Sequence, residues 1–197
     1  MLITSDDIAE KCRTVCITGP KPEKLPDSGN RNSQVIRSLK SVLYKAMLDC
    51  TQEGYNCFIT GFTEGVELWA GEIVLDFKAQ NKNVKLVVVS PYKDYISRFR
   101  SAEKFLAGNI TLKADQIVHI SEKYTGKCMN QRIEYMIARS GKLIAVVPDS
   151  KARKGAAIKY AESSGIITHI IDAGQFEAQI KENSIQTEAR KRRKLLF

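Results

Sequence analysis

Long apolar runs are missing from this sequence. No stretch approaches the roughly 18 to 20 consecutive apolar residues that a membrane-spanning helix needs. The opening, MLITSDDIAEKC, carries acidic residues where a secretory signal would carry basic ones. These absences argue against a membrane protein and against a secreted protein. We therefore expect a cytoplasmic protein without a membrane partner.

Paired-cysteine motifs are missing as well. The five cysteines, Cys12, Cys16, Cys50, Cys57 and Cys128, form an odd number and include no C-x-x-C pair. This pattern indicates neither a disulfide framework nor a zinc site. We expect reduced thiols, no metal and no resident cofactor.

Two common phosphate-binding fingerprints are also absent. Neither G-x-G-x-x-G nor G-x-x-x-x-G-K-[ST] occurs in the sequence. Their absence argues against an ordinary dehydrogenase and against a P-loop nucleotidase.

Basic residues, by contrast, are in excess. The 197 residues carry a formal net charge of +9, and the last ten, EARKRRKLLF, hold five basic side chains and one acid, which is +4 of that total. We expect one domain over residues 1–187 and a disordered basic tail over residues 188–197. The tail is either a solvated terminus or a contact to nucleic acid. The residues that would make this contact are Arg190, Lys191, Arg192, Arg193 and Lys194.

Six short apolar runs, rich in β-branched residues, predict six strands. They cover residues 14–19, 55–61, 85–90, 116–121, 142–147 and 166–172. Stretches with helical periodicity separate them. The two clearest run from Ser33, which can act as an N-cap, to Glu53, and from Gly65 to Gln80.

This alternation predicts an α/β fold. We expect a single Rossmann-like domain whose central, mainly parallel sheet of about six strands is covered by helices on both faces. Because the runs are apolar throughout, we expect central strands. His119 and His169 lie inside two of these runs, so we expect them to be core histidines.

The strand ends predict where a ligand binds. In open parallel sheets, ligands bind beyond the carboxyl ends of the strands, where glycine turns and helix N-termini offer free N–H groups. Hydroxyl, glycine and basic residues gather at these exits. The residues that we expect to bind a ligand there are Thr18, Gly19, Pro20, Lys21, Thr60, Gly61, Gly65, Ser90, Tyr92, Lys154 and Gly155.

Glu67 and Arg132 complete the candidate site. Glu67 falls in the first turn of the second helix, where a carboxylate is favourable whether or not it binds anything. Its functional alternatives are a hydrogen bond to a ribose hydroxyl and a catalytic role. Arg132 is either a phosphate clamp or a surface arginine paired with Glu134 or another neighbour. Tyr92 is a better candidate than Trp69 for stacking on a base, because we expect Trp69 to lie in the core or to pack between helix and sheet.

Three segments resemble one known family. The segments TGFTEGVELWAGE (60–72), ITGPKPEKLP (17–26) and YTGKCMNQRIEYMIARSGKLIAVVPD (124–149) closely resemble the YpsA-like family of the SLOG superfamily. This superfamily groups the DNA-processing protein DprA, the LOG phosphoribohydrolases and several nucleotide-sensing domains on a Rossmann-like fold. The resemblance extends over about residues 13–172. It implies a pocket lined by Gly19, Pro20, Lys21, Gly61, Gly65, Glu67, Arg132 and the loop after the fifth strand.

Three functions of different classes follow from these observations. The favoured one is a module that senses or sequesters a nucleotide-derived molecule, such as an ADP-ribose-like, NAD-like or cyclic nucleotide signal. The second is a LOG-like hydrolase or transferase that acts on N-glycosidic bonds of nucleoside phosphates with Glu67 or Glu64. The P-G-G-x-G-T-x-x-E motif of LOG enzymes, however, does not follow the fifth strand. The third is a DNA-binding protein of DprA type, favoured by the basic tail. By analogy with related folds, we also expect a homo-oligomer.

Overall fold

The protein is built on a sheet of six parallel strands. The computed structural model describes residues 10–27, 33–80, 82–149, 155–176 and 178–179. The strand order is β4-β3-β2-β1-β5-β6, and every neighbouring pair is parallel. All six predicted strands are confirmed. They are β1 (Thr14–Thr18), β2 (Cys57–Gly61), β3 (Lys85–Ser90), β4 (Gln116–His119), β5 (Lys142–Val147) and β6 (Ile167–Asp172).

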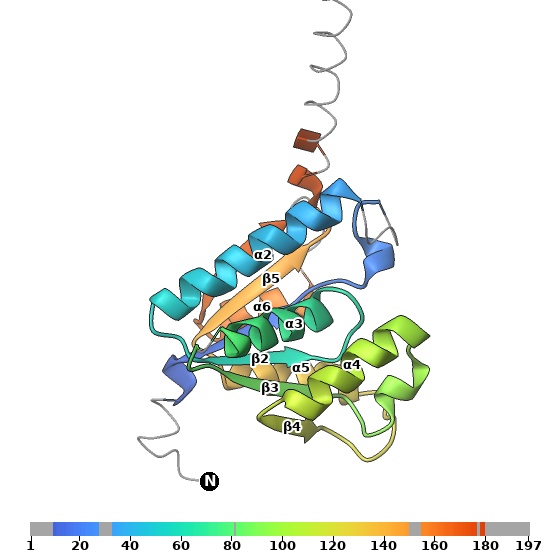
Figure 1. The fold of residues 1–197 in the computed structure, drawn as a ribbon. Helices are drawn as coiled ribbons and strands as arrows, with labels where there is room; N and C mark the ends of the chain where they lie inside the picture. The colour runs from blue at the N-terminus through green and yellow to red at the C-terminus, as the bar shows by residue number, and fades with distance from the viewer. Residues whose placement is uncertain (1–9, 28–32, 81, 150–154, 177, 180–197) are drawn as a thin grey trace, which may run out of the picture.

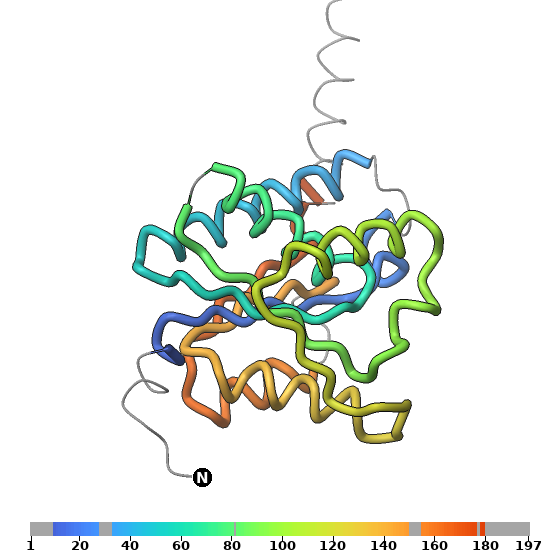
Figure 2. Tube along the Cα trace, turned by 60° about the horizontal axis from the view of Figure 1, so that its bottom comes forward, coloured from blue at the N-terminus to red at the C-terminus, as the bar shows by residue number. Residues whose placement is uncertain are grey.

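Helices cover both faces of the sheet, as Figure 1 and Figure 2 show. The helices of one face are α2 (Gln34–Gln52), α3 (Val66–Ala79) and α4 (Ser101–Lys113), and those of the other are α5 (Cys128–Ala138) and α6 (Ala156–Ser163). Two short 3-10 helices, η1 (Pro22–Lys24) and η2 (Tyr95–Arg98), follow β1 and β3. The predicted Rossmann-like α/β fold is confirmed.

Local signals at the ends of α2 match the prediction. The Ser33 hydroxyl accepts a hydrogen bond from the backbone N–H of Ile36 at 3.2 Å, which satisfies one of the free donors at the helix start. After the helix, Gly54 has a φ of 93°. Glycine adopts this left-handed conformation without the steric cost that other residues pay, so the chain turns into β2 at this point.

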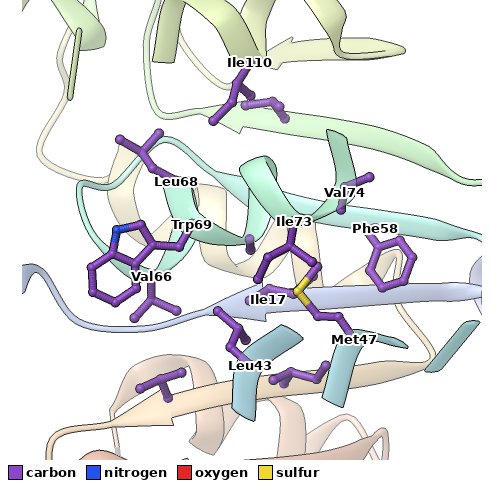
Figure 3. Packing of buried hydrophobic residues seen from close by; sticks show 14 of the residues in the cluster. Ile17, Leu43, Met47, Phe58, Val66, Leu68, Trp69, Ile73, Val74 and Ile110 are labelled. Atoms are coloured by element: carbon purple, nitrogen blue, oxygen red, sulfur yellow. The ribbon is translucent and has the colours of Figure 1, made fainter. Parts of the chain in front are cut away.

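Helix α3 lies between α2 and α4, and its buried side chains pack in the core between these helices and the sheet (Figure 3). Nine of its fourteen residues are buried. A Cβ on Gly71 would lie 2.8 Å from Ile110 Cδ1, so α3 and α4 approach closely there. Trp69 is 5% exposed and belongs to the buried hydrophobic cluster, which confirms the predicted core role, and Lys40 Nζ of α2 lies 4.8 Å from its ring centroid.

The prediction of core histidines is wrong. His119 and His169 are both exposed. The reason is the strand order, which puts β4 and β6 at the two edges of the sheet. An edge strand is covered less completely than a central one, so an apolar run there does not ensure burial of every residue.

The surface of α4 carries two strongly exposed apolar side chains. Phe105 is 81% exposed and Leu112 is 86% exposed. They lie seven residues apart, so they share one face of the helix.

The expected homo-oligomer stays a prediction. Within the described residues no helix has the length and apolarity to cross a bilayer. The basic tail predicted at 188–197 lies outside the described residues.

The cysteines differ sharply in accessibility. All five are free thiols; Cys12 is exposed and the other four are buried. Burial raises the pKa of the Cys16 thiol far above its usual range, and the nearby Glu67 carboxylate acts in the same direction. Burial also raises the pKa values of Cys50 and Cys57. Since the thiolate is the reactive form, buried thiols with raised pKa values react slowly.

We therefore expect an alkylating reagent at neutral pH to label one cysteine of the native protein rapidly, and that cysteine to be Cys12. Unfolding in denaturant should make all five react. Peptide mass spectrometry after timed quenching identifies the labelled residue. A Cys12→Ser variant is the control and should show no fast phase. Rapid labelling of Cys16 in the native state would contradict the burial described above.

Candidate functional site

Glu67 lies at the centre of the predicted site. It occupies the first turn of α3 and is 2% exposed. Its Oε1 accepts hydrogen bonds from the Thr18 hydroxyl at 3.1 Å and from Arg132 Nη2 at 3.3 Å. Its Oε2 accepts hydrogen bonds from the Thr63 backbone N–H at 2.8 Å and from Arg132 Nη1 at 2.7 Å. The protein itself therefore supplies two donors to each carboxylate oxygen.

Arg132 approaches this carboxylate from the other helical layer. It belongs to α5, whereas Glu67 belongs to α3, and it is only 4% exposed. Two guanidinium nitrogens contact the two carboxylate oxygens, which is the two-point geometry of a strong ion pair. The alternative of a surface arginine paired with Glu134 is wrong, because the side chain is buried and pairs with Glu67.

Gly61, the last residue of β2, leaves room for this ion pair. A Cβ at position 61 would overlap both Arg132 Nη1 and Glu67 Oε2. One residue earlier, the Thr60 hydroxyl donates a hydrogen bond to the backbone carbonyl of Glu67 at 3.0 Å. This bond fixes the start of α3 against β2. The buried pair thus requires a residue without a side chain at position 61.

The loops after β1 and β2 meet through two more of the predicted glycines. A Cβ on Gly19 would lie 2.7 Å from Val66 Cβ. Gly65 has a φ of 91°, which favours glycine, and a Cβ there would lie 3.0 Å from the Pro20 carbonyl oxygen. Pro20 is half-buried and Lys21 is exposed. The structure therefore brings the first two predicted loops together around the start of α3.

Two buried polar atoms beside the ion pair have unused hydrogen-bonding capacity. Within the described residues, Thr63 Oγ1 and Arg132 Nε have no hydrogen-bond partner. Thr63 is 7% exposed and Arg132 is 4% exposed. A buried polar group without a partner costs about 1–3 kcal/mol. No such signal was visible in the sequence, and Thr63 was not among the predicted site residues.

The third predicted loop is organised differently from the first two. The Ser90 hydroxyl donates a hydrogen bond to the Tyr92 backbone carbonyl at 2.7 Å. Tyr92 is only 5% exposed, so its ring faces are largely covered. The exposed aromatic ring in this region belongs to Tyr124, which is 60% exposed and lies 5.8 Å from Tyr92 between ring centroids. We therefore regard Tyr124, rather than Tyr92, as the residue accessible to a base.

The fifth predicted loop is described only at its ends. Gly155 is exposed and directly precedes α6. Lys154 lies outside the described residues.

The order of the strands reverses at β1. Strands β2, β3 and β4 are added on one side of β1, and β5 and β6 are added on its other side. In open parallel sheets this switch point is where ligands bind.

Two hollows of the surface lie away from these loops. One has a volume of about 600 Å³ and lies among α2, α3 and α4, with Trp69 and Ile73 in its lining. The other has a volume of about 370 Å³ and lies between α5 and α6, with Ile133 and Tyr160 in its lining. Neither is lined by a predicted site residue. Within the described part of the chain, no cluster of three or more His, Cys, Asp or Glu residues could hold a metal ion.

Comparison with known proteins places this geometry in a family. The family model described as the YspA SLOG family, with the short name YpsA, matches residues 15–173. The chain belongs to the YpsA family. The match includes every described residue of the site around Glu67 and Arg132. The predicted resemblance is therefore confirmed.

Curated relatives of this YpsA-family chain are proteins named UPF0398. One, from Halalkalibacterium halodurans, is 26% identical over 141 residues, which is 71% of this chain and 74% of the relative. Another, from Bacillus cereus (strain B4264), is 27% identical over 144 residues, which is 71% of this chain and 76% of the relative.

Solved structures of DNA processing protein A are similar in fold to this YpsA-family chain. The Helicobacter pylori protein, studied for its single-stranded DNA binding mode, has a TM-score of 0.52 and 15% identity, covering 95% of this chain and 85% of that one. The Streptococcus pneumoniae protein has a TM-score of 0.52 and 17% identity, covering 87% of this chain and 57% of that one. At these identities the similarity shows the Rossmann-like fold alone.

Proposed function

We propose that this YpsA-family protein binds a nucleotide-derived ligand, such as an ADP-ribose-like, NAD-like or cyclic nucleotide signal, and acts as a sensor or sequestering module. The ligand would lie at the carboxyl ends of β1, β2 and β5. The observation that carries the proposal is the pair of unpartnered buried atoms, Thr63 Oγ1 and Arg132 Nε, beside the first turn of α3. A ligand oxygen that reached either atom would accept its free hydrogen bond.

The charge and backbone of this region suit an anionic ligand. The start of α3 offers the positive end of the helix dipole to a ligand. Arg132 supplies a fixed positive charge, and Lys21 is an exposed cation on the loop after β1. Each of these features stabilises phosphate oxygens.

The bonding of Glu67 favours binding over hydrolysis. A catalytic carboxylate must reach the proton or the carbon centre on which it acts. Glu67 is 2% exposed and each of its oxygens already accepts two hydrogen bonds from the protein. We propose that Glu67 positions Arg132 and the loop after β2, and does not itself react. Glu64 is half-buried and is the carboxylate left for an N-glycosidic hydrolase.

A Thr63→Val substitution tests the site with little risk to the fold. Valine has nearly the shape of threonine, and the Thr63 hydroxyl has no protein partner to lose, so the free energy of unfolding should change by less than about 1 kcal/mol. Affinity for the ligand should fall roughly tenfold or more, because a hydrogen bond to a charged group contributes about 1.5–3 kcal/mol. Isothermal calorimetry with ADP-ribose, NAD and cyclic nucleotides measures this loss.

The matched control is Thr14→Val at the opposite end of β1. Thr14 is buried, and its hydroxyl donates a hydrogen bond to the Glu10 carbonyl at 2.7 Å, so this variant should lose about 1 kcal/mol of stability and no affinity. Equal affinity of the wild type and Thr63→Val for every bound nucleotide would refute the proposed site. Mass detection of each incubated compound separates binding from turnover, and release of a free base abolished by Glu64→Gln would establish the hydrolase instead.

A further inference from the structure

We propose that Tyr124, with Arg98 beside it, is a stacking platform for an unpaired nucleobase at the same edge of the sheet. This inference rests on the proposed function, because the base belongs to the ligand whose phosphates the Glu67–Arg132 region would bind. It assigns the other end of that ligand to the loops after β3 and β4.

Tyr124 is exposed, but its ring is supported from behind. It is 60% exposed and meets the buried Tyr92 edge to face, with the ring centroids 5.8 Å apart and the ring planes at 83°. Tyr92 in turn meets Tyr95 at 5.4 Å, and Tyr95 meets Phe99 at 5.4 Å. An aromatic ring held in this way loses little conformational freedom when a base stacks on it.

Arg98 adds a planar cation to this aromatic cluster. Its guanidinium carbon lies 5.6 Å from the Tyr92 ring centroid and 5.9 Å from the Tyr124 ring centroid, within the range of cation–π attraction. Arg98 itself is exposed. A tyrosine ring beside an exposed guanidinium is the combination that binds bases by stacking and a neighbouring phosphate by charge.

The two loops that carry the platform are joined and basic. Lys93 Nζ, after β3, forms an ion pair with Glu122 Oε2, after β4, at 2.6 Å. The segments 91–100 and 120–127 together contain five basic and two acidic side chains. The second segment leads directly into α5, which carries Arg132. The platform and the proposed phosphate site thus lie on consecutive strand exits of one sheet edge.

The Tyr92 hydroxyl, in the same aromatic cluster, has unused hydrogen-bonding capacity. It is buried and has no hydrogen-bond partner within the described residues. Tyr92 packs against the ring of Tyr124, so its hydroxyl belongs to the same cluster. A ligand group that displaced the atoms covering this hydroxyl would be able to pair with it.

An unpaired base can come from a free nucleotide or from a single-stranded nucleic acid, and the test distinguishes the two. Affinities of the full-length chain are measured for ADP-ribose and for oligo(dA), and for their base-free counterparts, ribose 5-phosphate and an abasic strand of equal length. Tyr124→Ala should weaken binding of the base-bearing probe about 5- to 150-fold, as expected for the loss of one stacked base, and leave the base-free probe unchanged. Tyr124→Phe should retain the affinity, and Phe105→Ala, which removes an exposed ring from α4, should have no effect.

The pattern of losses decides among the outcomes. A base-dependent loss with ADP-ribose supports a nucleotide as the source of the base, and the same loss with oligo(dA) supports a single strand. Unchanged affinity of Tyr124→Ala for every base-bearing probe, or equal losses with and without the base, overturns the platform. If Thr63→Val weakens ADP-ribose binding and Tyr124→Ala does not, the proposed function stands and the platform alone fails. If the wild type binds no base-bearing probe, both fail.

Discussion

Replacing Arg132 with leucine is expected to lower the free energy of unfolding by about 3–5 kcal/mol. The substitution removes the only cation that the described residues pair with the buried Glu67 carboxylate, and a buried charge without a partner is strongly destabilising. Urea denaturation followed by circular dichroism measures the effect. A loss below about 1 kcal/mol would show that the pair contributes no more than a surface ion pair.

Two further variants show whether this loss of stability comes from the unpaired buried charge. Adding Glu67→Gln to Arg132→Leu removes the uncompensated charge, so the double variant should be less destabilised than the sum of the two single variants. The control is Lys45→Leu on α2, where Lys45 Nζ lies 3.0 Å from Asp49 Oδ2 and the two side chains are 75% and 45% exposed. Breaking this surface pair should change the stability by less than about 1 kcal/mol.

Gly61→Ala is expected to cost at least about 3 kcal/mol and to abolish ligand binding. The added methyl group would overlap Arg132 Nη1 and Glu67 Oε2, so the pair must separate or β2 must shift. Overpacking alone costs about 1–3 kcal/mol, and separation of a buried pair adds to it. Denaturation and calorimetry on the same preparation measure stability and affinity together.

The matched glycine control should change stability in the opposite direction. Gly108 lies within α4, and a Cβ there would meet nothing within 4 Å. Gly108→Ala should therefore stabilise the protein by about 0.5–1 kcal/mol, because alanine loses less backbone entropy in a helix. Equal destabilisation by Gly61→Ala and Gly108→Ala would show that the close contact at Gly61 has no specific role.

Local sequence patterns predicted the sheet and helices α2 and α3, because apolar runs, a capping serine and a glycine turn are local signals. The same patterns failed where the answer depends on strand order. His119 and His169 lie in apolar runs, but their strands are at the edges of the sheet.

The candidate site was predictable in position but not in bonding. Glu67, Gly61 and Arg132 could be chosen from residue type and from their places after strands. Their mutual contact could not, because Glu67 and Arg132 are 65 residues apart and no local pattern records the pairing. The unpartnered Thr63 hydroxyl and the exposed Tyr124 ring are likewise properties of the folded chain only.

The ion pair between α3 and α5 also affects the local unfolding of these two helices. The pair joins a helix of one layer to a helix of the other layer across the ends of the strands. If the start of either helix detached, the charged partner on the other helix would be left buried and unpaired. The first hydrogen-bonded amides of the two helices, which begin at Trp69 in α3 and at Gln131 in α5, should therefore exchange as one cooperative unit with a common opening free energy. A ligand held by Arg132 would slow that exchange on both faces of the sheet at once.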